Sequence, residues 1–128
     1  MKVEVTAALD DIKCQFPDAD VSVREDGQGG AYVVASPIKI GSRFRPEFTW
    51  FGFHIPPLYP YADIYPVFMG PEVVRADGVA LVAPVTPNAS FEGRAAIQIS
   101  RRYGAAAQGQ QKVTAKLLKV LDFLERMP

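Results

Sequence analysis

The chain has 128 residues, of which 48% are hydrophobic, and it carries 14 basic and 14 acidic side chains. A chain of this length and composition forms one core, so we expect a single domain spanning residues 1–128. Balanced charge without a basic run argues against a nucleic-acid partner. A single cysteine, no cationic-then-apolar leader and no long apolar stretch predict a cytoplasmic protein without membrane contact.

The first third of the sequence predicts a helix followed by a β-hairpin. Apolar residues spaced by three and four predict a helix that ends before Pro17: Val5, Ala8, Leu9, Ile12 and Phe16. Residues 20–25 then alternate between apolar and polar, residues 26–30 (DGQGG) suit a turn with positive φ angles, and residues 31–36 read as the return strand.

The remainder predicts more strands and a closing helix. Residues 47–55 (EFTWFGFHI) suit a central strand, whereas the prolines of residues 56–66 require a rigid, extended loop. Residues 67–70 and 72–84 read as further strands, the latter around a turn at Asp77–Gly78. A stripe at helical spacing predicts the last helix: Val113, Leu117, Val120, Leu121 and Leu124. The predicted class is α+β.

Two segments of the chain resemble the ubiquitin-conjugating enzyme family. Residues 53–68 (FHIPPLYPYADIYPVF) are similar to the family's strand, tyrosine–proline loop and short apolar strand, with Pro57, Tyr59 and Pro60 fixing the loop. The second segment resembles the active-site stretch, in which His-Pro-Asn precedes a glycine by five residues and the catalytic cysteine by eight. This chain has Thr86–Asn88, Gly93 and, at the cysteine position, Ala96.

The resemblance implies a ubiquitin-conjugating-enzyme-like fold: an N-terminal helix, an antiparallel β-meander, an irregular active-site segment and a C-terminal helix. It also implies a carrier that receives a ubiquitin-like protein from an activating enzyme as a cysteine thioester and passes it to an amine. A thiolate suits both the attack and the later departure. The chain departs from the family pattern in having Thr86 in place of histidine and a single closing helix. In this it resembles bacterial relatives most, and that resemblance implies antiviral conjugation as the setting.

The same resemblance implies the roles of particular residues. Ala96 marks the nucleophile position, and Asn88 is the expected oxyanion donor, although asparagine also serves simply to bond loop backbone. Gly93 is expected to adopt a backbone angle closed to other residues. A ubiquitin-like tail is expected to lie extended beside residues 86–100, and the expected binding residues are Thr86, Pro87, Gly93, Arg94, Ile97 and Arg101. The expected partners are a ubiquitin-like protein and an activating enzyme, with neither a cofactor nor a metal.

Three explanations of Ala96 stay open. In the first, alanine replaces a native cysteine, which the persistence of Asn88 and Gly93 around it favours. In the second, the chain is a natural non-catalytic variant that binds a ubiquitin-like protein as an adaptor. In the third, the domain is an interaction module unrelated to ubiquitin-like proteins, and both motif matches are coincidental.

The two remaining residues with reactive side chains are expected to be structural. Cys14 lies on the first predicted helix, far in sequence from Asn88, and we expect it to be a small buried residue. His54 is the one histidine, and it lacks cysteine or carboxylate neighbours at metal-ligand spacing. We therefore expect a structural histidine within a strand.

Overall fold

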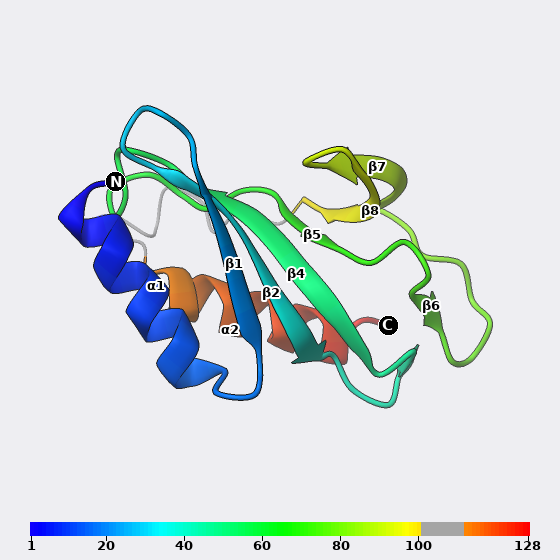
Figure 1. The fold of residues 1–128 in the computed structure, drawn as a ribbon. Coiled ribbons are helices and arrows are strands. Elements are labelled where there is room, and N and C mark those ends of the chain that lie inside the picture. Colours follow the sequence, from blue (N-terminus) through cyan, green and yellow to red (C-terminus); the bar gives the residue numbers. More distant parts are fainter. Residues whose placement is uncertain (101–111) are drawn as a thin grey trace.

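A computed structural model describes residues 1–100 and 112–128 and confirms the α+β class (Figure 1). Helix α1 (Val3–Gln15) is followed by the strands, and helix α2 (Val113–Glu125) closes the chain. The strands are β1 (Asp20–Glu25), β2 (Ala31–Lys39), β3 (Phe44–Arg45), β4 (Phe48–Ile55), β5 (Val67–Met69), β6 (Val74–Arg75), β7 (Val85–Phe91) and β8 (Arg94–Ile99).

Six strands form one antiparallel sheet in the order β1-β2-β4-β5-β8-β7, and β3 pairs with β6 in a separate two-stranded sheet. Strands β1, β2, β4 and β5 follow one another as the predicted meander. The β7–β8 hairpin extends the sheet, because β8 pairs with β5 and leaves β7 at the edge. The free edges of the main sheet are therefore β1 and β7.

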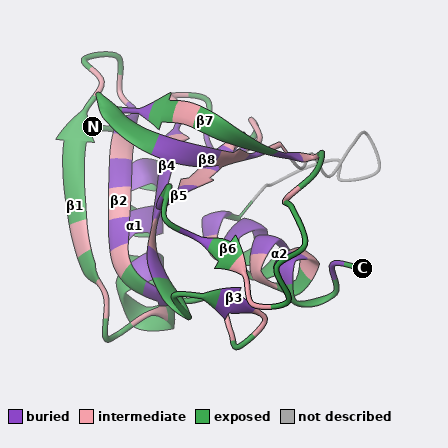
Figure 2. Cartoon of the chain, turned by 90° about the vertical axis from the view of Figure 1, so that its right-hand side faces the viewer, coloured by how far each residue is buried: buried purple, intermediate pink, exposed green. Residues whose placement is uncertain are grey.

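Both helices cover the same face of the main sheet (Figures 1 and 2). The residues that bury their side chains there alternate along the strands, as with Val33, Phe51 and Phe53, and recur on α1 and α2. The loop of residues 56–66 is fastened to α2. The Val113 N–H donates to the Tyr59 hydroxyl at 3.1 Å, and burial raises the pKa of Tyr59.

Two predicted segments differ from the structure. Residues 85–99 form a β-hairpin with one irregularity between Thr86 and Ala89, where a wholly irregular segment was expected, because a tight turn reverses the chain and Ile97 and Ile99 are buried beside β5. Residues 76–84 are turns and loop and not strand, because β8 takes the place beside β5 where they would have paired. The four predicted strands at residues 20–25, 31–36, 47–55 and 67–70 are confirmed, with β2 three residues longer.

Cys14 is exposed, so the expectation of a buried cysteine is wrong. The buried face of α1 consists of Val5, Ala8, Leu9 and Ile12, and a residue two positions after Ile12 points about 200° away from it. In the described part of the chain, neither helix has the length and apolar character needed to cross a lipid bilayer.

Candidate functional site

The expected site residues lie together on the β7–β8 hairpin. Thr86, Pro87 and Asn88 belong to β7, and Arg94, Ala96 and Ile97 belong to β8. Gly93 lies in the turn between them. Arg101 falls outside the described residues. One supersecondary element therefore brings together every expected residue that the structure describes.

The hairpin turn needs glycine at position 93. Phe91 pairs with Arg94, so the turn has two residues, Glu92 and Gly93, with φ angles of 51° and 78°. Positive φ at both positions is the signature of the type I′ turn, whose twist matches that of the strands. The prediction that Gly93 adopts a conformation unfavourable to other residues is confirmed.

A β-bulge places Asn88 beside the strand that carries Ala96. Thr86 pairs with Gln98 and Ala89 pairs with Ala96, so Pro87 and Asn88 together stand opposite Ile97. Asn88 has a φ of 63°, which asparagine tolerates better than most residues. Its side chain is exposed and makes no hydrogen bond to another described residue. The bulge explains why asparagine fits here, and the side chain is exposed.

The hairpin tip packs against the sheet face opposite the helices. Phe91 is 6% exposed, and its ring centroid lies 5.0 Å from that of Phe68 and 6.4 Å from that of Trp50. It fits because Gly52 lies beneath it: a Cβ at position 52 would stand 2.7 Å from the Phe91 ring. This seat requires glycine in the middle of a central strand, where glycine is otherwise unfavourable.

Charged groups fasten the same tip to β1 and β4. The Arg24 guanidinium donates to both Glu92 carboxylate oxygens at 2.8 and 2.7 Å, and it lies 4.6 Å from the centroid of the Tyr32 ring. The Arg94 guanidinium lies 5.0 Å from the centroid of the Trp50 ring. The hydrogen bonds from Arg24 hold the pKa of Glu92 below its usual value. We call Phe91, Glu92 and Arg94, with these partners, the clamp.

The clamp encloses position 96. Alternation along β8 puts Ala96 on the same side as Arg94, and the register with β7 puts Phe91 on that side too. This side of the hairpin faces the sheet, and Ala96 has an exposed fraction of 0%. A nucleophile at position 96 would therefore be reached by another protein only after the hairpin had moved.

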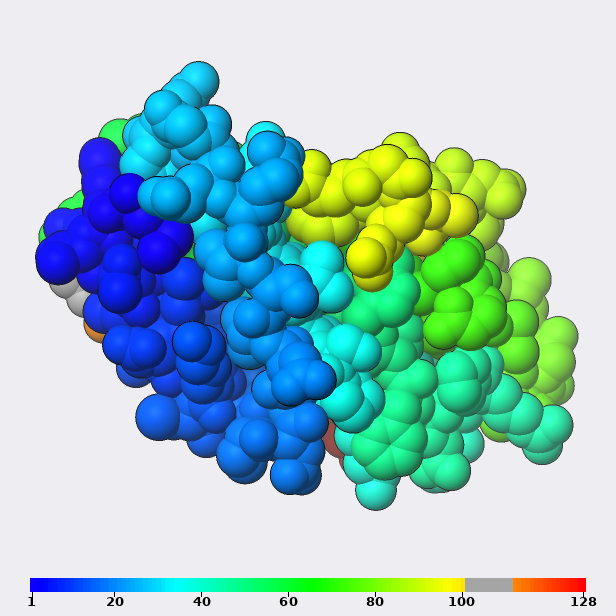
Figure 3. Space-filling view, viewed as in Figure 1, coloured from blue at the N-terminus to red at the C-terminus, as the bar shows by residue number. Residues whose placement is uncertain are grey.

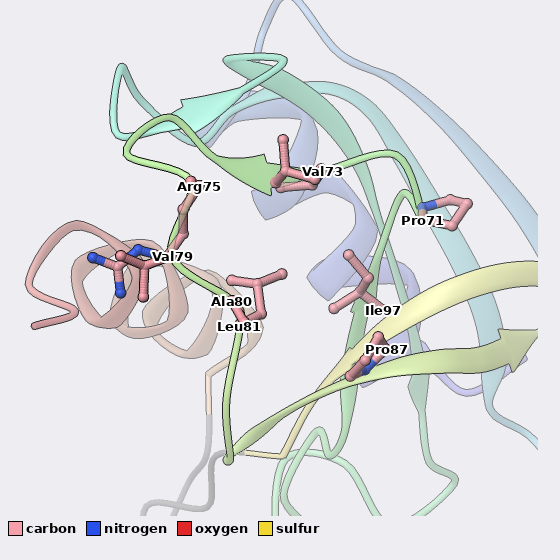
Figure 4. Close-up of a pocket in the computed structure, with 10 residues that line it drawn as sticks. Pro71, Val73, Arg75, Val79, Ala80, Leu81, Pro87 and Ile97 are labelled. Atoms are coloured by element: carbon pink, nitrogen blue, oxygen red, sulfur yellow. The ribbon is translucent and has the colours of Figure 1, made fainter.

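An apolar pocket lies on the opposite side of β8. Its volume is about 490 Å³, and Pro87 and Ile97 form part of its wall. Figure 4 shows the remaining wall, which comes from the connection between β5 and β6 and from the loop that precedes β7. That part includes Pro71, Val73, Val74, Arg75, Val79 and Leu81. Since consecutive strand residues point to opposite faces, Ile97 lines the pocket while its neighbour Ala96 faces away from it.

Ionic contacts hold the loop side of the pocket in place. The Arg75 guanidinium donates to both carboxylate oxygens of Asp77 at 3.1 and 2.7 Å and to the carbonyl oxygen of Pro128 at 2.6 Å. Asp77 in turn accepts the Val79 N–H at 3.0 Å. The hydrogen bonds from Arg75 hold the pKa of Asp77 below its usual value. These contacts join the Asp77–Gly78 turn to β6 and to the C-terminal residue.

His54 contacts the β1–β2 turn through Asp26. Its Nε2 lies 2.7 Å from Asp26 Oδ2, and its ring stacks on Tyr32 with centroids 4.5 Å apart. Asp26 also accepts the backbone N–H groups of Gln28 and Gly30, which fixes the β1–β2 turn. Within residues 1–100 and 112–128 no cluster of three or more histidine, cysteine or carboxylate side chains could hold a metal ion.

No family model matches the sequence, and no match was found among curated proteins or solved structures. The resemblance described above therefore depends on the two sequence segments and on the order of the elements.

Sequence reasoning missed both the clamp and the pocket. The clamp joins residues far apart in the chain, and its one local sign is Gly52 inside an aromatic strand. The pocket had a clearer sign. Val74, Val79 and Val82 surround the Asp77–Gly78 turn between two prolines and are exposed, which is unusual for so many valines in one loop.

Proposed function

We propose that the chain is a ubiquitin-conjugating-enzyme-like adaptor that binds the C-terminal tail of a ubiquitin-like protein without carrying it covalently. The observation behind this proposal is the opposite placement of two adjacent residues. Ile97 lines an apolar pocket of about 490 Å³, whereas Ala96 is buried on the other side of the strand. A tail held in the pocket is thus separated from the position where the family has its nucleophile.

The pocket suits an extended apolar segment of a partner. Its volume lies within the range of about 300–1,000 Å³ that is common for ligand sites. Proline and valine side chains dominate its wall, so the contact is mainly apolar. Main-chain pairing along β7 contributes less than the sequence suggests, because Pro87 lacks an N–H and the bulge interrupts the edge.

The thioester carrier is the second candidate. The spacing of Asn88, Gly93 and position 96 favours it, as does the exposed amide of Asn88, since such an amide can stabilise an oxyanion. It needs two changes in the molecule: a cysteine at position 96 and a hairpin that opens. The partners of this candidate are a ubiquitin-like protein and its activating enzyme.

A binding measurement with matched variants tests the adaptor. Val79→Arg places a charge in the pocket at a residue that is 54% exposed, and Leu118→Arg makes the same change on α2 at a residue that is 43% exposed. We expect calorimetry with a ubiquitin-like protein to show at least about tenfold weaker binding for Val79→Arg. The Leu118→Arg variant should bind like the parent chain. Equal affinity in all three proteins would exclude the pocket as the site.

Restoring the nucleophile separates the two candidates. Ala96→Cys is incubated with the ubiquitin-like protein, its activating enzyme and ATP, and the products are run on a non-reducing gel. The adaptor predicts no thiol-sensitive adduct although the activating enzyme itself becomes charged. An adduct that disappears with reductant would replace the adaptor with the carrier.

A further inference from the structure

The two free edges of the main sheet differ in how they resist pairing with another strand. β7 carries Pro87 and a bulge, and both interrupt the row of backbone donors and acceptors. β1 has neither. Its six residues pair with β2 without a break in register, and β2 is its one strand partner among the described residues.

The β1 edge is also open to solvent. Five of its six residues are exposed, and Val23 has an exposed fraction of 41%. The strand runs along the surface between α1 and the hairpin tip, and no other element covers it (Figures 2 and 3). A regular, uncovered edge strand with an uncharged centre is a template for an added strand.

The sequence of β1 is complementary to itself. When two copies of DVSVRE pair antiparallel about Ser22, Asp20 stands opposite Arg24 and Val21 stands opposite Val23. Opposite charges placed directly across two strands stabilise a pair, as do facing β-branched residues. Because the arrangement has twofold symmetry, each dimer contains the Asp20–Arg24 contact twice.

Arg24 can donate hydrogen bonds to Asp20 of a second copy while it stays bonded to Glu92. Glu92 accepts from its Nε and Nη2 groups, and no other described residue accepts a hydrogen bond from Nη1. The Asp20 side chain makes no hydrogen bond or ion pair with a described residue. Arg24 is on the face of the sheet that carries the clamp, and the pairing would put the partner's Asp20 on that same face.

We infer that β1 is a homodimerisation edge, through which two copies join their main sheets in one continuous antiparallel sheet. The partner at this edge is a second copy of this chain, because the order of Asp20 and Arg24 along β1 makes the strand complementary to itself. A pair of six-residue strands buries less than the roughly 1,200 Å² of a stable complex, so the dimer is weak and depends on concentration. This inference does not depend on the proposed ligand of the pocket.

Sedimentation of complementary charge variants tests the inference. The parent chain is measured from about 10 µM to about 1 mM, and its mass should rise from 14.0 kDa towards twice that value. Asp20→Arg sets arginine against Arg24, and Arg24→Asp sets aspartate against Asp20. Each variant alone should dimerise at least about tenfold more weakly than the parent. An equal mixture of the two should dimerise again, because both pairs between positions 20 and 24 in the heterodimer then join opposite charges.

Two further readouts keep the result specific. Far-ultraviolet circular dichroism should show the same helix and strand content in both variants, since both side chains are exposed and the hydrogen bonds that Arg24→Asp loses join Arg24 only to Glu92 at the hairpin tip. In the parent chain, alternate β1 amides should exchange more slowly at high concentration. A parent chain that stays monomeric at 1 mM overturns the inference, and so does a dimer that survives in Asp20→Arg alone. A mixture that stays monomeric while both variants are folded overturns the pairing about Ser22.

Discussion

Adding one methyl group beneath the hairpin should loosen the clamp. In Gly52→Ala the new Cβ would stand 2.7 Å from the Phe91 ring, which is closer than real Cβ contacts allow. Either the side chains around Gly52 are strained, or Phe91 moves away from the sheet and becomes exposed. Overpacking costs about 1–3 kcal/mol, and exposing a buried phenylalanine costs about 1.5–3 kcal/mol. Replacing glycine in a strand returns about 0.4–1 kcal/mol, so the net loss is about 1–2 kcal/mol.

A double-mutant cycle isolates the contact. In a Phe91→Ala background the added methyl loses its contact with the Phe91 ring but still stands 2.9 Å from the Trp50 ring, so the Gly52→Ala penalty should become smaller without disappearing. The coupling between the two positions is then roughly 1 kcal/mol. Urea unfolding followed by the fluorescence of Trp50, the one tryptophan, measures all four proteins. A Gly52→Ala penalty that is the same in both backgrounds would refute the close approach of Phe91 to Gly52.

Two further predictions concern acid stability and the hairpin backbone. The pKa of Asp26 is lowered, first by its hydrogen bond with His54, so its stabilisation is complete above its unfolded pKa of about 3.9 and is lost as the pH falls through the folded value. The melting temperature of Asp26→Asn should therefore fall less steeply than that of the parent chain below about pH 4, and an equal slope would contradict this linkage. Gly93→Ala should cost about 1–2 kcal/mol because of its positive φ, whereas Asn88→Gly should be nearly neutral. Thermal unfolding of both variants measures these costs. Equal losses of stability in Gly93→Ala and Asn88→Gly would contradict a type I′ turn at Glu92–Gly93.

Short-range patterns predicted most of the fold. Helical spacing gave α1 and α2, and alternation with a glycine-rich turn gave β1 and β2 with the correct bounds for β1. The β7–β8 hairpin was missed, although Glu92–Gly93 has the form of a two-residue turn, because the family's irregular layout was carried over to residues 86–100. The strand expected within residues 79–84 failed because apolar residues there line a pocket and join no sheet.

The sequence was enough to predict which residues belong to the candidate site, but not which side of the hairpin each one faces. Spacing alone brought Asn88, Gly93 and Ala96 to attention, and one hairpin does carry all three. Which side of β8 faces the clamp, as Ala96 does, and which faces the pocket, as Ile97 does, depends on how the hairpin twists over the sheet. This in turn depends on Phe91 meeting Gly52, a contact across 39 positions of sequence that no local pattern encodes.

The clamp therefore governs the choice between adaptor and carrier. If position 96 supports transfer, then Gly52→Ala should increase the adduct formed by Ala96→Cys, because a looser hairpin exposes the thiol. If the chain binds without transfer, then neither the single nor the double variant forms an adduct. In both cases affinity at the pocket should change little, since the pocket lies on the other side of β8. An adduct confined to the double variant would mean that carrier chemistry is present and that the closed hairpin prevents it.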